Sequence, residues 1–404
     1  ILFKQKVLSL SNNQTNTEII NYRKKHIGKS LKLHYDEPLR IVRGEGVYLI
    51  DHKGRKYLDT VNNVAHVGHE NEDVVSEGKN QMSLLNTNSR YLHESINALT
   101  KELLSTVPKE LSVVHYVNSG SEANELAIRM MKAHSGSNNI IVSQHGYHGN
   151  TNVCVDISSY KFDGKGGNGA PENTYVIPIP NKFNGKYKGN KTGDQYVSEI
   201  KKQIKKIKQD KRVLGGFIIE PIISCGGQVE LPKGFLKKAY NEIRRNGGIC
   251  ISDEVQVGCG RVGKSFWGFQ AHNVIPDIIT IGKPLGNGHP IGAVICKKEI
   301  AESFANGMEF FNTFGGNPVS CSIALEVIKT VKRKKLQKNA KLVGNYFKNE
   351  LIKLSRDNKV IADVRGEGLF LGIEFLNSEK NPLSKETKYI CLLYTSDAAD
   401  ELLG

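Results

Sequence analysis

The sequence predicts an α/β fold with a mostly parallel sheet, and three observations support this prediction. Short apolar runs at 140–142, 213–219, 248–252 and 278–281 have the length of buried strands. Amphipathic stretches that suit helices separate several of these runs, and such alternation is typical of parallel sheets. Polar or reactive residues follow three of the runs, namely Glu220, Asp253 and Lys283. Open α/β sheets bind their ligands at this edge.

Other segments predict the elements around this sheet. Residues 48–59 indicate a hairpin with its turn at Lys53 and Gly54, and residues 121–132 indicate a helix that residues 118–120 open. Ile204 and Ile207 are three apart among lysines, which predicts an amphipathic helix with a solvated face. The stretch 163–191 is rich in Gly, Asn and Lys, and we expect a long surface loop there.

The charge pattern favours a solvated basic surface over a polyanion-binding one. The formal net charge is +15, and the densest basic clusters lie at 201–208 and 332–335. Neither cluster contains the interleaved aromatic residues on which nucleic-acid bases stack. We therefore expect no nucleic-acid partner. The sequence has no run of about 18 or more apolar residues, so we expect no membrane partner.

Asp253 and Lys283 follow neighbouring predicted strands and suit the chemistry of pyridoxal 5'-phosphate (PLP). That chemistry requires a lysine amine that forms an imine with the cofactor. It also requires a carboxylate that keeps the pyridine nitrogen protonated, so that the ring accepts electrons from the substrate. A structural salt bridge between the two residues is the alternative, and the pair alone does not exclude it.

Two further motifs fit a phosphorylated planar cofactor. "NSGSEAN" (118–124) places Ser119, Gly120 and Ser121 at a predicted helix start, where backbone N–H groups and the helix dipole favour an anion. An ordinary capping box explains the same residues. "GYHG" (146–149) places Tyr147 between glycines, where its ring could stack on a flat cofactor. A core tyrosine is the alternative.

Taken together, six ordered motifs resemble the class III aminotransferases, which are fold-type I PLP enzymes. They are "NSGSEAN", "GYHG", "IIEP" (218–221), "SDEVQVGCGRVG" (252–263), "TIGKPLGNGHP" (280–290) and "FNTFGGNP" (311–318). The resemblance covers about residues 21–375. It implies a large domain with a mostly parallel sheet flanked by helices and a small α+β domain, which is incomplete in this sequence.

The resemblance also implies a role for each matching residue. Lys283 and Asp253 would be catalytic, and Lys283 would bind the cofactor covalently. Thr313 would reach the cofactor phosphate of a partner subunit, which implies a homodimer with shared active sites. The expected cofactor-binding residues are Ser119, Gly120, Ser121, Tyr147, Glu220, Asp253, Val255, Gln256, Lys283 and Thr313.

Within that class, the motifs resemble the phospho-lyases that act on phosphoethanolamine or phosphohydroxylysine. The similarity lies in "NNVAHVGH" (62–69), "LLNTNSRYLH" (84–93), "SCGGQ" (224–228) and "NTFGGNPVSC" (312–321). It implies elimination of phosphate and ammonia from a small phosphorylated amine, with conversion of phosphoethanolamine to acetaldehyde as the leading expectation and phosphohydroxylysine as the alternative substrate. Glu220 followed by Pro221 is instead common in aminotransferases, so amino-group transfer stays an alternative. A non-catalytic basic binding protein is a further alternative. The expected substrate contacts are Asn63, His66, Arg90 and Tyr91, with Arg90 as the first choice for a phosphate.

The organisation follows from the same comparison. We expect residues 1–58 to belong to the small domain, 59–314 to form the PLP-binding domain, and 315–391 to return to the small domain. Residues 392–404 resemble a foreign tail. The seven cysteines are scattered without a C-x-x-C pair, which predicts neither a zinc site nor a disulfide framework. We expect a reducing compartment, either the cytoplasm or the mitochondrial matrix.

Overall fold

The computed structural model describes residues 14–33, 35, 37–384 and 387 as two compact units, each of which is considered by itself. The predicted tail at 392–404 lies outside the described residues. The smaller unit contains an antiparallel sheet in the order β1-β2-β3, and β2 and β3 form the predicted hairpin. Its elements are α2 (Asn16–His26), β1 (Ile41–Glu45), β2 (Tyr48–Asp51) and β3 (Lys56–Leu58). Thr15 and Glu18 form a capping box that begins α2.

The larger unit consists of Asn63–Val67 and Glu72–Pro382, and it is built on a seven-stranded sheet in the order β4-β12-β11-β10-β7-β5-β6. Only β12 runs antiparallel to its neighbours, so the prediction of a mostly parallel sheet is confirmed. The strands are β4 (Leu111–Val117), β5 (Asn139–Ser143), β6 (Thr174–Ile177), β7 (Leu214–Ile219), β10 (Ile249–Asp253), β11 (Ile278–Ile281) and β12 (Gly292–Lys297).

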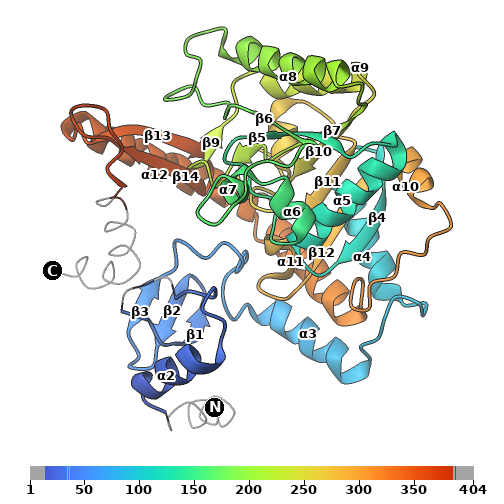
Figure 1. Cartoon of the computed structure of the whole chain (residues 1–404). Helices are drawn as coiled ribbons and strands as arrows, with labels where there is room; N and C mark the ends of the chain where they lie inside the picture. The colour runs from blue at the N-terminus through green and yellow to red at the C-terminus, as the bar shows by residue number, and fades with distance from the viewer. Residues whose placement is uncertain (1–13, 34, 36, 385–386, 388–404) are drawn as a thin grey trace. The chain divides into compact units, whose positions relative to one another are not determined.

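Apolar side chains cover both faces of this sheet because successive residues of a strand point to opposite sides. In β7, for example, Phe217 and Ile219 pack against α8 and α9, whereas Ile218 packs on the other face with residues of α5. Figure 1 shows α8 and α9 side by side above β5, β6 and β7. The helices of the unit are α3 (Glu72–Leu84), α4 (Glu94–Leu104), α5 (Gly120–Ser135), α6 (Asn152–Asp156), α7 (Ser159–Phe162), α8 (Thr192–Gln209), α9 (Phe235–Arg245), α10 (Lys298–Phe304), α11 (Pro318–Arg333) and α12 (Leu336–Asp357).

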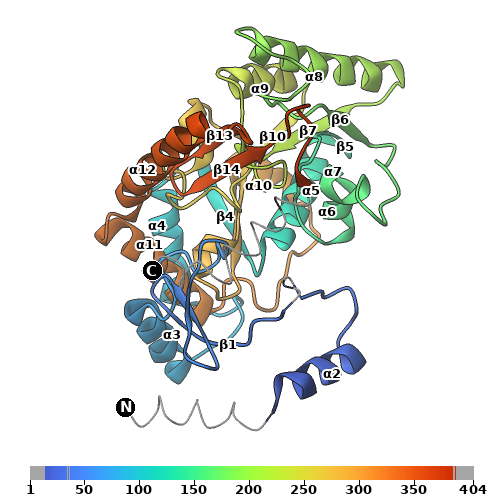
Figure 2. The same cartoon turned by 90° about the vertical axis from the view of Figure 1, so that its left-hand side faces the viewer.

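Short elements complete the larger unit. Two antiparallel hairpins and two 3-10 turns connect or extend the main layers, and Figure 2 shows α12 beside β13 and β14. These elements are β8 (Ile222–Ile223), β9 (Val229–Glu230), β13 (Ile361–Glu367), β14 (Phe370–Phe375), η1 (Gly268–His272) and η2 (Lys283–Gly286). The domain boundaries expected at 58, 314 and 391 stay a prediction.

One expected element is wrong. The stretch 163–191 is not a continuous surface loop, because Thr174–Ile177 forms the edge strand β6 and pairs in parallel with β5. Three of its four residues are buried. The strand is short and is surrounded by Gly, Asn and Lys, so the composition of the whole stretch concealed it. The predicted helix face is confirmed, since Ile204 and Ile207 are buried in α8.

Candidate functional site

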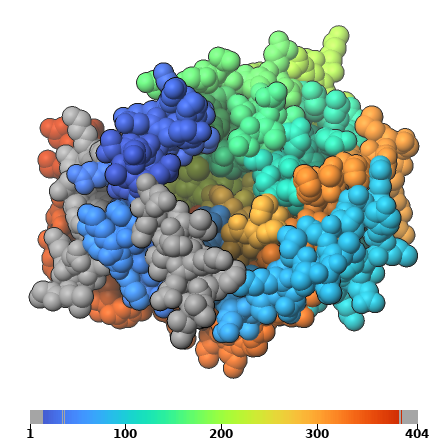
Figure 3. Space-filling view, turned by 90° about the horizontal axis from the view of Figure 1, so that it is seen from below, coloured from blue at the N-terminus to red at the C-terminus, as the bar shows by residue number. Residues whose placement is uncertain are grey.

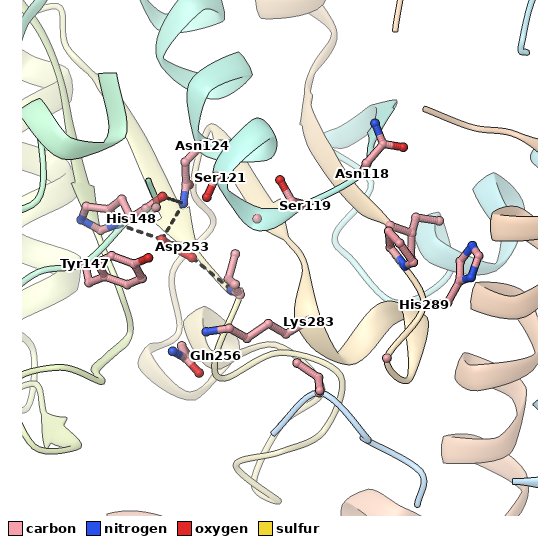
Figure 4. Close-up of a pocket in the computed structure, with 17 residues that line it drawn as sticks. Asn118, Ser119, Ser121, Asn124, Tyr147, His148, Asp253, Gln256, Lys283 and His289 are labelled. Carbon is pink, nitrogen blue, oxygen red and sulfur yellow. Dashed lines mark hydrogen bonds and ion pairs between the residues drawn. The ribbon is translucent and has the colours of Figure 1, made fainter. Parts of the chain in front are cut away.

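A cavity of about 400 Å³ lies at the carboxyl ends of the central strands of the larger unit (Figure 4), and its volume is within the usual range for small-molecule sites. Eight residues that the sequence predicted as cofactor contacts line it, which brings segments far apart in the chain to one place. They are Ser119, Gly120, Ser121, Tyr147, Asp253, Val255, Gln256 and Lys283.

Asp253 is the last residue of β10, and three donors fix its buried carboxylate. The amide of Asn124 and Nδ1 of His148 each lie 2.8 Å from Oδ2, and the backbone N–H of Val255 donates to Oδ1 at 3.0 Å. Figure 4 shows Asn124 of α5 and His148 of the loop after β5 directed at the carboxylate. Asp253 is therefore held rigidly at the cavity wall. A carboxylate that pairs with a cationic group of a ligand needs such a fixed position.

Lys283 follows β11, the strand next to β10, and its side chain extends into the cavity (Figure 4). Burial lowers the pKa of its amine, although the carboxylates of Asp253 and Glu220 act in the opposite direction. A lower pKa increases the fraction of neutral amine, which is the nucleophilic form. The backbone approach that places Lys283 needs glycine, because a Cβ on Gly282 would lie 2.9 Å from the Cα of Gly120.

The N-terminus of α5 presents donors to the same cavity. Ser119 is the N-cap, and its Oγ accepts from the N–H of Glu122 at 3.1 Å. The Oγ of Ser121 accepts from the N–H of Asn150 at 3.2 Å. Among the described residues neither hydroxyl donates, so both hydrogens are available to an anion. With the helix dipole, this set suits a phosphate.

The cavity residues between the N-terminus of α5 and the strand ends at Asp253 and Lys283 suit a flat ring. Val255 lines the cavity from the segment after β10, and Tyr147 lines it from the loop after β5. Val255 packs closely on the start of α5, because a Cβ on Gly120 would lie 2.8 Å from its side chain. The cavity can therefore hold a phosphorylated pyridine aldehyde. It offers a hydroxyl-rich helix end, an apolar and an aromatic wall, a fixed carboxylate and a lysine. The residues present thus fit PLP.

Glu220 lies behind the cavity wall and is not among the residues that line it. One carboxylate oxygen accepts from the N–H of Tyr147 at 3.2 Å, and the other accepts from the N–H of Ser224 at 3.0 Å and from its hydroxyl. Burial, together with the nearby Asp253, raises the pKa of Glu220 to about 7. Glu220 therefore links the loop of the predicted stacking residue to the turn after β7.

Of the predicted substrate contacts, Asn63 and His66 lie in the segment 63–67, whose residue Val64 lines the cavity. The amide of Asn63 donates to Gln256. The ring of His66 lies 2.8 Å from the carbonyl oxygen of Cys259 and 3.1 Å from the guanidinium of Arg261. Burial, and secondarily Arg261, lowers the pKa of His66 to about 3, so the ring is neutral at physiological pH.

Arg90, Tyr91 and Thr313 do not line the cavity of their own chain. Arg90 pairs with Glu309 at 2.9 Å, and its guanidinium lies 3.9 Å from the centre of the Phe311 ring. Tyr91 is 67% exposed and Thr313 is also exposed. The exposed position of Thr313 is compatible with the expectation that it acts on a partner subunit, and its role stays a prediction.

Sequence reasoning missed Asn124 and His148. Both contact Asp253 directly, and both line the cavity. Ser119, Gly120 and Ser121 form the predicted binding site for the cofactor phosphate, which we call the phosphate cradle. Asn124 follows Ser121 by one helical turn, so its position on the same helix face could have indicated it. His148 stands within the quoted "GYHG" motif, but only the tyrosine was assigned a role. That both residues bond to Asp253 became evident only from the folded structure, in which they contact the end of β10.

Comparisons with known proteins agree with this geometry. The family model "Aminotransferase class-III" matches residues 32–395. An alanine–glyoxylate aminotransferase 2-like protein of Drosophila melanogaster is 43% identical over 92% of this chain and 77% of its own length. An ethanolamine-phosphate phospho-lyase homolog of Caenorhabditis elegans is 36% identical over 89% of this chain and 80% of its own. A phospholyase from Arthrobacter, solved in complex with phosphoethanolamine, superposes with a TM-score of 0.87 at 35% identity and covers 92% of this chain and 88% of its own.

Proposed function

The chain belongs to the class III aminotransferase family and uses pyridoxal 5'-phosphate, and from this premise we propose that it eliminates phosphate and ammonia from a small phosphorylated amine. Phosphoethanolamine is the proposed substrate, and acetaldehyde is the carbon product. The observation that carries the proposal is the likeness, at 35% identity, to the Arthrobacter phospholyase that was solved with phosphoethanolamine. The phospho-lyase homolog of Caenorhabditis elegans supports it independently.

When bound, PLP supplies an electron-poor ring that stabilises negative charge on the substrate carbon next to the amine. The fixed and buried carboxylate of Asp253 would pair with the ring nitrogen and hold its proton. Lys283 would hold the cofactor, and its amine, which reaches into the cavity, would take the proton from that substrate carbon. The C–O bond to phosphate on the next carbon then breaks. Hydrolysis of the released enamine consumes one water and yields acetaldehyde and ammonia.

Arg261 supports an anionic substrate. Its guanidinium donates to His66 at 3.1 Å, and no carboxylate among the described residues forms an ion pair with it. Burial lowers the pKa of Arg261. A partly buried cation without a counterion in the protein is unfavourable because its charge is desolvated and not compensated. A substrate phosphate near the segment 63–67 would be such a counterion. Within this proposal, Arg261 replaces Arg90 as the phosphate contact of the same chain, because it contacts His66 of the segment 63–67, although Arg261 itself does not line the cavity.

The proposal includes a homodimer. Thr313 is exposed on the loop before α11, and the resemblance that identified it implies a hydroxyl directed at the partner's cofactor phosphate. We further place the protein in the cytoplasm or the mitochondrial matrix. Within the part of the chain that the structure describes, no helix has the length and apolar character needed to cross a membrane.

Amino-group transfer is the second candidate, because the Drosophila relative at 43% identity is named as an aminotransferase 2-like protein and Glu220-Pro221 is the pattern common in aminotransferases. The two reactions differ in their need for an acceptor. Elimination returns the cofactor to its aldehyde form in each turnover, whereas transamination must alternate with a keto acid.

Phosphoethanolamine without any keto acid therefore tests the proposal. We expect phosphate, ammonia and acetaldehyde in equal amounts over many turnovers. A single burst that stalls and resumes when pyruvate or 2-oxoglutarate is added would refute elimination in favour of transfer. Phosphohydroxylysine as the better substrate would keep the reaction type and change the substrate.

A further inference from the structure

The carboxylate of Glu122 connects two parts of the chain that lie almost 200 positions apart in the sequence. Its Oε2 accepts from the N–H of Asn118 at 2.8 Å, from the amide of Asn118 at 3.0 Å and from the amide of Asn312 at 3.1 Å. The two asparagines also bond to each other, with Nδ2 of Asn118 2.9 Å from Oδ1 of Asn312. Three donors on one oxygen form a fixed cluster rather than a single surface contact.

This cluster differs from an ordinary capping box in the N–H group that Glu122 binds at the start of α5. Ser119 is the N-cap and Glu122 is the third helical residue, a position from which a Glu side chain usually accepts from the N-cap N–H. Here Glu122 accepts from the residue before the cap, Asn118. The N–H of Ser119 consequently has no acceptor among the described residues. It remains available to an anion, next to the hydroxyls of Ser119 and Ser121.

The other side of the cluster is the turn 312–315, which carries Thr313. Asn312 Oδ1 closes this turn by accepting from the N–H of Phe314 at 3.2 Å and of Gly315 at 2.9 Å. Gly315 fits closely against β4, because a Cβ there would collide with the carbonyl oxygen of Tyr116. The turn is therefore fixed at one end by β4 and at the other by Glu122, with the exposed Thr313 between them.

We propose that Glu122 is a positioning residue that aligns the phosphate cradle of its own subunit and, through Asn312, the Thr313 hydroxyl that serves the partner's cofactor. One carboxylate then affects cofactor retention at both sites of a dimer. The inference rests on the PLP-binding dimer of the proposed function, but not on whether the reaction is elimination or transfer. Loss of bonds to a charged acceptor predicts at least about tenfold weaker PLP binding at each affected site.

Mixed dimers of the full-length holoenzyme test this inference. One subunit carries a substitution, the other is unchanged, and the two differ in mass through an affinity tag. After equilibration at limiting PLP, borohydride fixes the cofactor to Lys283, and the intact mass of each subunit reports the occupancy of each site. We expect Glu122→Ala in one subunit to lower the occupancy of both sites. Ser121→Ala should lower only its own site, and Thr313→Ala only the partner's site.

Two variants separate positioning from general damage to the fold. Asn312→Ala removes the link to the turn while Glu122 still bonds to Asn118, so it should weaken only the partner's site. Glu122→Gln retains a carbonyl oxygen as acceptor and should restore most of the occupancy. The role of Glu122 would be overturned if Glu122→Ala lowered the PLP occupancy only of the mutated subunit's own site while Thr313→Ala still lowered that of the partner's site. No effect of Thr313→Ala on the partner would instead overturn the shared site on which the inference rests.

Discussion

Lys283 is the residue on which the assignment of the site depends most directly. Its amine is partly buried beside Asp253, and burial lowers its pKa. We expect Lys283→Ala to abolish borohydride-fixed PLP while retaining non-covalent binding through Ser119 and Ser121. Lys161, whose Nζ lies 5.5 Å from the centre of the Tyr147 ring, offers a matched control. Lys161→Ala should keep the fixed cofactor, measured by intact mass. PLP fixed to another lysine in the Lys283 variant would contradict the assignment.

For individual residues, the sequence indicated which residue types line the site but not which of their side chains form hydrogen bonds with one another. Asp253 and Lys283 were predictable because a polar residue directly after an apolar strand has one possible location, the sheet edge. Asn124 and His148 were not predictable in the same way, since they act by contacting Asp253 across the fold. Arg261 was hidden within a glycine-rich motif, and its unpaired charge became evident only from its neighbours.

At the scale of elements, Glu254 connects β10 to the turn η1. Its fully buried carboxylate accepts from the N–H groups of Gly268 at 2.7 Å and Phe269 at 2.9 Å, and from the Ser252 hydroxyl at 3.1 Å. Burial nevertheless raises the pKa of Glu254 from 4.5 to about 7. Between these values the folded protein binds more protons than the unfolded chain. The free energy of unfolding therefore falls as pH rises through this window.

A glutamine at this position tests that dependence, because it cannot titrate. The contribution of Glu254 to the fall is at most about 3 kcal/mol. Between pH 4.5 and pH 7 we expect the free energy of unfolding of the apo Glu254→Gln protein to fall less, or rise more, than that of the unsubstituted protein, as measured by denaturant titration. Glu220 is unchanged in both proteins, so its own titration cancels in the comparison. Equal pH slopes would show that Glu254 stays ionised in the fold.

No prediction was made for β4 and β12, whereas β5, β7, β10 and β11 could be predicted because each is a short apolar run. The strand β6 could not, since its four residues stand in a stretch whose composition suggests a loop. Pairing with β5 and burial of Tyr175 at 4% exposure outweighed that composition. The helix α5 was predicted, but the bond between its Glu122 and the distant Asn312 could not be inferred from the sequence of the helix itself.

At the scale of the whole molecule, one exposed apolar surface supports the proposed dimer. We call it the 84–92/308–314 surface, and the ion pair of Arg90 with Glu309 joins its two segments. Figure 3 shows light-blue and orange atoms side by side on this face of the molecule. Its exposed side chains include Leu84, Leu85, Tyr91, Leu92, Met308, Phe311 and Phe314. Large apolar side chains exposed on neighbouring segments are typical of subunit interfaces.

A charge placed on this surface should therefore weaken the dimer. Phe314 is 67% exposed, and we expect Phe314→Asp to shift the full-length protein toward monomer in sedimentation velocity, with a loss of PLP retention. Val213, 61% exposed at the start of β7, offers an equally exposed apolar control. Val213→Asp should leave the dimer intact. An unchanged dimer in the Phe314 variant would place the interface elsewhere.

The separation of the cofactor residues along the chain has a consequence for the lifetime of the protein. The cradle at 119–121 and the strand ends at 253 and 283 are covalently remote, so the binding site exists only in the folded protein. A ligand that binds only the native state stabilises it by mass action, by about 2.7 kcal/mol at a hundredfold excess over the dissociation constant. Vitamin B6 status would thus control how long the protein survives proteolysis in a cell, and the apo form would be degraded first.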